Sequence, residues 1–181
     1  MDRERFTLGD NMRKLLILLL FITSAQAEVL KLSQGQVEFK AKAKPALISI
    51  DGKSNLLSGT LTGEDNIFDG NFDLELTSLD TGIELRDDHL KNKYLEIEKF
   101  PNAKLSFTKT RIEKNKEINF EAKLNLHGQE KMVQGIATLN DDNRLEAEFK
   151  INLSDFGIDI PSFKGITVAK EVKIKVNGKV E

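Results

Sequence analysis

Apolar and polar residues alternate along most of the chain after residue 35. This two-residue period is typical of β-strands that turn one face to an apolar interior and the other to water. The longest regular run is Ile118–Leu126, in which every second residue is apolar and the residues between are charged or amide side chains. The other runs, of which the fifth is the least regular, occupy residues 36–44, 57–62, 68–76, 103–108, 132–139, 144–153 and 172–177. The pattern predicts about eight strands.

Short polar segments separate these runs and predict the turns between them. They are Asp51-Gly52, Gly63–Asn66, Lys114–Lys116, His127-Gly128 and Asn140–Asn143. Connections this short join antiparallel neighbours, because a parallel crossover needs about a dozen residues or more. A sheet with one apolar face must cover that face, either by closing into a barrel or by folding into a sandwich. The sequence therefore predicts an all-β antiparallel domain, and alternation alone leaves both architectures open.

Residues 81–95 interrupt the two-residue period. Thr81 and Glu84 have the spacing of a capping box, with a hydroxyl at the helix N-cap and a carboxylate three residues later. Apolar residues then recur at mostly helical spacing, at Ile83, Leu85, Leu90, Tyr94 and Leu95. We predict a short helical insert over residues 83–93.

The N-terminus has the organisation of a cleavable signal peptide. The basic pair Arg13-Lys14 precedes eight apolar residues, Leu15–Ile22, and Ala25-Gln26-Ala27 has the small-x-small form that signal peptidases cleave. The apolar run is far shorter than the ~20 residues that a bilayer span needs, so we expect no stable membrane anchor. We expect cleavage after Ala27 and export of the mature chain, to the periplasm.

The remaining residues 28–181 have the length of one domain. Because Met12 directly precedes the basic pair, residues 1–11 can be an over-long start. The formal net charge of −2 gives no reason to expect a nucleic-acid partner. The chain has no cysteine, which excludes disulfides, thiol nucleophiles and thiolate metal sites.

The sequence indicates no metal, cofactor or catalytic centre. The two histidines, His89 and His127, belong to different elements, and we interpret His127, beside a turn glycine, as a solvated side chain. His89 follows Asp87 and Asp88, and a carboxylate–histidine pair can act as a general base. Acidic residues at a helix start are explained more simply by the helix dipole. We therefore expect a protein that is not an enzyme.

The inward-facing positions define the candidate ligand site. They are mostly large and apolar, and we select them as pocket candidates: Phe39, Phe68, Phe72, Leu76, Leu105, Phe107, Ile118, Phe120, Leu124, Phe149 and Ile151. Small inward residues leave volume between them, at Ala41, Ala43, Gly59, Gly70, Ala122 and Ala147. An eight-stranded barrel is wide enough to hold one slender ligand or to be filled by its own side chains. Spacing does not decide between these two interiors.

Several segments resemble the signature of the YceI-like lipid/polyisoprenoid-binding family. They are Ser78–Gly82, Arg86–Lys91, Glu96–Pro101, Leu105–Phe107, Leu124–Lys131, Phe149–Ile158 and Val168–Val176. The resemblance covers roughly residues 36–180 and implies an exported, lipocalin-like antiparallel barrel that holds a long isoprenoid or other lipid chain. It also makes the helical insert a plug or lid at one end, with pocket-end candidates Arg86, Asp87, His89 and Leu90.

Two functions follow from these observations. The first is a periplasmic binding protein for a long-chain apolar amphiphile, such as a polyisoprenoid, a quinone or another lipid, held inside the barrel. The alternative is a non-catalytic structural or protein-interaction module whose barrel is filled by side chains.

Overall fold

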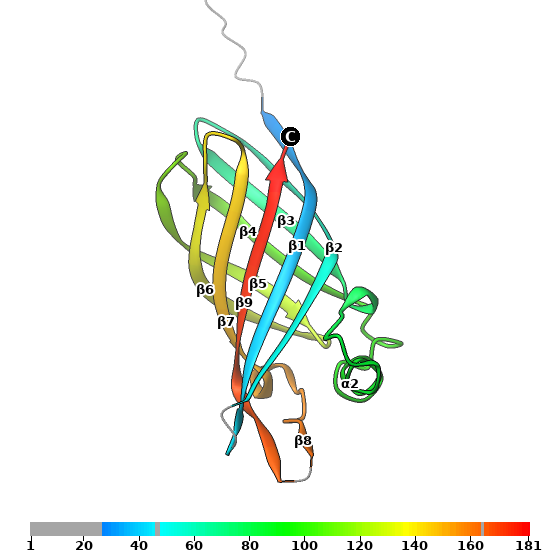
Figure 1. The fold of residues 1–181 in the computed structure, drawn as a ribbon. Coiled ribbons are helices and arrows are strands. Elements are labelled where there is room, and N and C mark those ends of the chain that lie inside the picture. Colours follow the sequence, from blue (N-terminus) through cyan, green and yellow to red (C-terminus); the bar gives the residue numbers. More distant parts are fainter. Residues whose placement is uncertain (1–26, 46–47, 164) are drawn as a thin grey trace, which may run out of the picture.

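The computed structural model describes residues 27–45, 48–163 and 165–181. Eight strands form an antiparallel barrel, which closes because the last strand pairs with both β7 and β1 (Figure 1). A ninth strand of two residues, β8, extends the sheet beside β9. The expected lipocalin-like barrel is confirmed. The predicted signal peptide lies outside the described residues, apart from Ala27.

The eight barrel strands follow one another around the barrel in chain order, whereas β8 pairs only with β9. The strands are β1 (Glu28–Lys44), β2 (Ile48–Glu64), β3 (Ile67–Glu75), β4 (Asn102–Arg111), β5 (Glu117–Leu126), β6 (Gln129–Leu139), β7 (Arg144–Asn152), β8 (Ser162–Phe163) and β9 (Ile166–Val180). The helical segments are η1 (Leu76–Ser78), α2 (Glu84–Asp88), η2 (His89–Tyr94) and η3 (Leu153–Phe156). Within the described ranges, no helix is long and apolar enough to span a membrane.

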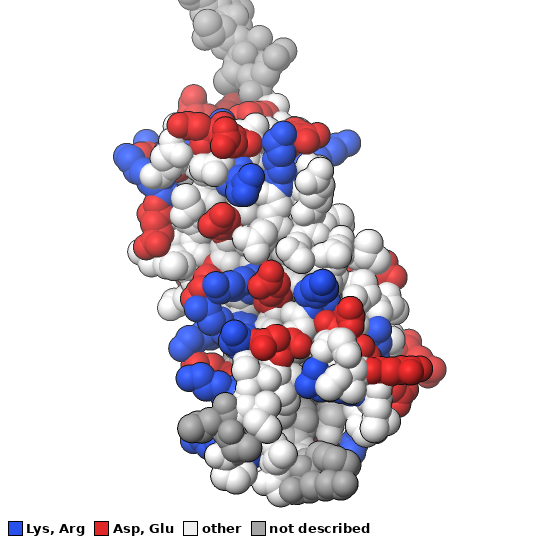
Figure 2. All heavy atoms as spheres, viewed as in Figure 1, with Lys and Arg blue, Asp and Glu red and all other residues white. Residues whose placement is uncertain are grey.

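The alternation of the sequence gives the barrel its two faces. In β5, Phe120, Ala122, Leu124 and Leu126 are buried and the residues between them are exposed. The outer face carries charged side chains of both signs (Figure 2), some of them paired, as in Lys123–Glu130 at 2.9 Å. The polar residues therefore keep the outside in water and the apolar residues fill or line the inside.

The predicted turn at Asp51-Gly52 is wrong. Both residues lie within β2, where Gly52 pairs with Phe39 of β1. The Phe39 ring covers this glycine so closely that a Cβ atom there would overlap it. Gly52 is thus required for close packing of an aromatic ring. The hairpin itself lies between Lys44 and Ile48.

Rings of neighbouring strands also cover two glycines that we expected to leave volume inside the barrel. The Phe72 ring lies against Gly59, and the Phe107 ring lies against Gly70. Each glycine is the direct cross-strand partner of the phenylalanine whose ring covers it. The space at these glycines is therefore filled by aromatic side chains.

The predicted helical insert is present, but the capping box is not. The insert consists of α2 followed by the π-helical turn η2, and Ile83 is the N-cap of α2 without a side-chain cap. Thr81 does not cap this helix, because its backbone N–H and its hydroxyl both donate to the Asp87 carboxylate, at 2.8 and 2.5 Å. Thr81 and Asp87 thus tie the loop to the second half of α2.

The buried residues form two clusters. The larger one surrounds the middle of the barrel and the end nearest the helical insert. The smaller cluster lies at the other end, near the C-terminus, and consists of Leu61, Phe68, Ile112, Leu139, Leu145 and Val180. Leu61 is 1% exposed and Val180 is fully buried, so this end of the barrel is closed by packed side chains.

Candidate ligand cavity

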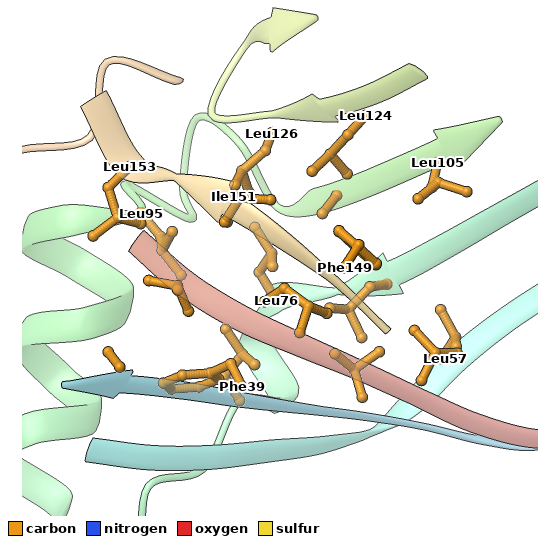
Figure 3. A pocket seen from close by; sticks show the side chains of 18 of the residues that line it. Phe39, Leu57, Leu76, Leu95, Leu105, Leu124, Leu126, Phe149, Ile151 and Leu153 are labelled. Carbon is orange, nitrogen blue, oxygen red and sulfur yellow. The ribbon is translucent and has the colours of Figure 1, made fainter. Parts of the chain in front are cut away.

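A cavity of about 620 Å³ lies inside the barrel. Of the 45 residues that line it, 38 are apolar. The volume falls in the range of ligand-binding pockets, about 300–1,000 Å³. The interior is therefore partly packed and partly open, with the open part enclosed almost wholly by hydrocarbon side chains (Figure 3).

The cavity runs from the closed end of the barrel to the end that carries the helical insert. Its floor includes four residues of the smaller cluster, Leu61, Ile112, Leu139 and Leu145. Side chains from the barrel strands line its middle, and Figure 3 shows several of them, among them Phe39 and Leu57. The lining thus extends along the barrel from one end to the other.

The mouth of the cavity reaches the molecular surface. Ile48, Ile83 and Leu85 line the cavity, yet their side chains are 46%, 53% and 63% exposed. Pro161 and Ile166, on either side of β8, complete the rim together with α2. The apolar lining thus continues from the interior to an open edge between the helical insert and the β8–β9 hairpin.

Polar lining residues are few, and most of them lie near the mouth. The seven are Thr81, Arg86, His89, Tyr94, Thr110, Thr138 and Ser162. Four of these belong to residues 81–94, so the helical insert supplies most of the polar chemistry at the open end. Arg86, His89 and Leu90 share one face of the helical insert because residues three and four positions apart are neighbours on a helix.

Arg86 is held in place by Thr81. Its Nε donates to the Thr81 hydroxyl at 2.9 Å, and one terminal NH₂ donates to the Thr81 carbonyl oxygen at 2.6 Å. Thr81 in turn donates to Asp87, as described above. The neighbouring Asp80 is anchored to β2 through a two-hydrogen-bond bridge with Lys53. The arginine is thus oriented by a loop that is itself fixed to the barrel.

Ten of the eleven apolar pocket candidates line the cavity. Phe68 does not, because it is buried in the smaller cluster at the closed end. Among the pocket-end candidates, Arg86, His89 and Leu90 line the cavity, whereas Asp87 is turned to Thr81. Sequence reasoning missed the exposed rim residues, since they lie at the ends of strands and in the helical insert, outside the alternating runs.

The interpretation of His127 as a solvated side chain is wrong. Its side chain is 13% exposed, its Nδ1 lies 3.1 Å from the Phe156 carbonyl oxygen and its Nε2 lies 3.0 Å from Glu96. The ring also packs edge-on against Phe100, with centroids 4.7 Å apart. Hydrogen bonds from Lys99 and then from His127 lower the pKa of Glu96. His127 thus joins the segment after η2, the β5–β6 turn and η3.

Within the part of the chain that the structure describes, no group of three or more His, Cys, Asp or Glu side chains converges as a metal site would require. The polar turn after β6 makes hydrogen bonds to the β4–β5 loop: Asn115 donates to Asp141, and Lys114 donates to Asn143. These hydrogen bonds join the β6–β7 turn to the β4–β5 loop.

Solved structures share this fold. A polyisoprenoid-binding domain from Saccharophagus degradans superposes with a TM-score of 0.64 at 14% identity, covering 87% of this chain and 98% of that domain. BcnA from Burkholderia cenocepacia superposes with a TM-score of 0.66 at 17% identity, covering 81% of this chain and 96% of BcnA. At these identities the likeness shows the barrel fold alone.

Sequence comparison gives the family. A UPF0312 protein from Pseudomonas putida W619 is 28% identical over 172 residues, which are 80% of this chain and 90% of that protein. Another from Pseudomonas putida F1 is 27% identical over the same shares. The family model of the YceI-like domain matches residues 29–180. Because this match spans most of the sequence, the chain belongs to the YceI-like family.

Proposed function

We propose that this protein is an exported binding protein that carries a long-chain apolar amphiphile with its tail inside the barrel. The observation that carries the proposal is the 620 Å³ cavity, which is lined by 38 apolar residues and open at one end. Burial of hydrocarbon in such a cavity stabilises a complex by about 0.8 kcal/mol for each CH₂ group. A slender tail gains most, because the barrel surrounds it along its length.

The nature of the tail is supported by comparison. The structural neighbour from Saccharophagus degradans is described as a polyisoprenoid-binding domain. A polyisoprenoid, a quinone with an isoprenoid tail or another lipid chain has the slim apolar form that the cavity admits. We therefore propose this class of ligand for the chain.

The N-terminal sequence supports the proposed export. The basic pair, the apolar run and the Ala25-Gln26-Ala27 motif support export to the periplasm. Strand β1 begins at Glu28, so cleavage after Ala27 leaves the whole barrel in the mature protein. N-terminal sequencing of the protein from a periplasmic extract should begin at Glu28, and a chain that retains residues 12–27 would contradict the proposed export.

We assign no catalytic step to the acidic and histidine residues of the helical insert. The Asp87 carboxylate accepts both of its hydrogen bonds from Thr81. This arrangement orients a loop, and within the described residues no hydrogen bond or ion pair joins His89 to the carboxylate that a general base of this type uses. A carrier function needs no such base.

Mass spectrometry of organic extracts tests the proposal. The protein is purified from its native host without detergent, extracted, and compared with protein that has been delipidated and refolded. We expect a lipid with a long apolar tail in near-stoichiometric amount in the native sample alone. Repeated absence of any lipid, together with failure of the delipidated protein to take up long-chain amphiphiles, would contradict the function.

A further inference from the structure

We propose that Arg86 forms a head-group site at the cavity mouth and that it selects amphiphiles with an anionic head, a carboxylate or a phosphate. The inference rests on the proposed function and deepens it, because the cavity fixes only the tail. Arg86 lines the cavity at its open end, between the exposed rim residues Ile83 and Leu85 and the apolar Leu90. A head group at this position leaves its tail directed into the barrel.

The guanidinium is oriented before any ligand arrives. Two of its five N–H donors are used by Thr81, at 2.9 and 2.6 Å, which leaves three for a ligand. The guanidinium offers donors only, in a planar fork that matches the paired oxygens of a carboxylate or phosphate. The chemistry of the site therefore calls for a head group that accepts hydrogen bonds.

The charge of Arg86 is the second argument. Among the described residues, no carboxylate oxygen lies within 4.0 Å of the guanidinium. Three acidic residues near it in sequence have other contacts: Asp87 accepts from Thr81, Asp88 from Asn92 and Asp80 from the Gly82 N–H. Glu84, two residues before Arg86, is exposed and is not among the residues that line the cavity. A cation at the edge of an apolar cavity is stabilised by an anion brought beside it. Asp87 reaches the guanidinium only through the Thr81 hydroxyl, so a ligand with a negative head supplies the direct ion pair that the described residues do not form with it.

His89 extends the same polar edge. It follows Arg86 by three positions on the helical insert and also lines the cavity. Its imidazole can donate one further hydrogen bond to an oxygen of the head group. Leu90, Tyr94 and Leu95 follow along the lining, and Leu95 is only 7% exposed, so the lining becomes more buried and more apolar toward the barrel. The order of these residues matches the order of head and tail in an amphiphile.

Competition binding tests the inference. Purified, delipidated protein is loaded with the fluorescent probe N-phenyl-1-naphthylamine, which is displaced at pH 7.5 by one of three competitors: dodecanoate, dodecyl phosphate or dodecanol. The two anions are used below their micelle concentrations and dodecanol below its solubility limit. Variants are Arg86→Met, Arg86→Lys and, as a matched loss of one positive charge at the closed end, Arg144→Met. Arg144 is the exposed first residue of β7 and does not line the cavity.

We expect wild type and Arg144→Met to bind at least one anion more tightly than dodecanol. Arg86→Met should weaken the anions about ten- to hundredfold, the loss expected for charge-assisted hydrogen bonds, and leave dodecanol within about twofold. Arg86→Lys, which keeps the charge, should retain part of the preference, and the better anion tells a carboxylate lipid from a phosphate lipid. The head-group site would be overturned if wild type bound dodecanoate, dodecyl phosphate and dodecanol with equal affinity. Equal weakening of all three amphiphiles by Arg86→Met would overturn it as well. Either result leaves the proposed function standing. Failure of all three amphiphiles to bind would contradict both the head-group site and the proposed function.

Discussion

Replacing Ala147 by phenylalanine places a ring inside the cavity, just above its floor. Ala147 lies on β7 opposite Ala137 and Val176, and all three line the cavity. A phenyl ring takes up about the space of four chain methylenes, which corresponds to about 3 kcal/mol of lost tail burial. The dissociation constant of a long-tailed amphiphile should therefore rise about 200-fold. Displacement of the same naphthylamine probe by hexadecanoate measures it.

The stability of the variant separates an open cavity from a packed core. Because the new ring enters open space, the free energy of unfolding in urea should change by less than about 1 kcal/mol. Ala122→Phe is the matched contrast: Ala122 is buried on β5, only 1% exposed, and does not line the cavity. Overpacking there should destabilise the barrel by about 1–3 kcal/mol.

The opposite result would refute the reasoning. If Ala147→Phe destabilises the protein as much as Ala122→Phe and leaves hexadecanoate binding unchanged, the space beside Ala147 is filled by side chains and the ligand binds elsewhere. The alternative of a structural or protein-interaction module with a filled barrel would then explain the protein better.

Three further substitutions test individual contacts. In His127→Asn, asparagine tolerates the left-handed backbone at φ 52° but is too short to reach Glu96. The free energy of unfolding should therefore fall by about 1–3 kcal/mol, and a change below about 0.5 kcal/mol would show that the contact is unimportant. Hydrogen bonds from Lys116 and then Arg111 lower the pKa of Glu113 to about 2, so its contribution is present above the ordinary pKa of 4.5 and is lost as the pH falls toward 2. The stability difference between wild type and Glu113→Gln should accordingly be largest above pH 4.5 and vanish near pH 2, and a difference that does not vary with pH would contradict this coupling. Gly135→Ala puts a Cβ against a carbonyl oxygen of β7 and should destabilise by about 1–3 kcal/mol in urea unfolding; unchanged stability would mean that the strands separate easily.

The strands could be predicted because a two-residue period indicates which face of each strand is buried and which is exposed to water. Ile118–Leu126 shows this most clearly, since its alternating side chains are buried and exposed as expected. Barrel closure could not be read from that period, because it depends on β9 pairing with β1 over a separation of more than a hundred residues. The family signature, including Arg86–Lys91, supplied that information instead.

The cavity illustrates a different limit. Sequence spacing placed ten of the eleven apolar pocket candidates correctly but could not show where rings fill the space, since Phe72 and Phe107 cover the glycines opposite them. Asp51-Gly52 was mistaken for a turn for the same reason: a glycine can permit a close approach as well as a sharp bend. His127 was missed because its partners, Glu96 and Phe156, are about thirty residues away in sequence.

A chain-length series of n-alkyl carboxylates, measured by the same displacement assay on delipidated wild-type protein, addresses the binding of a tail inside the barrel. Each added methylene should lower the dissociation constant about fourfold, which corresponds to about 0.8 kcal/mol. The affinity should level off once the tail fills the 620 Å³ cavity. An affinity that does not depend on chain length would contradict an enclosed apolar cavity as the binding site. So would an affinity that still rises with every added methylene for the longest carboxylates that can be measured below their micelle concentrations.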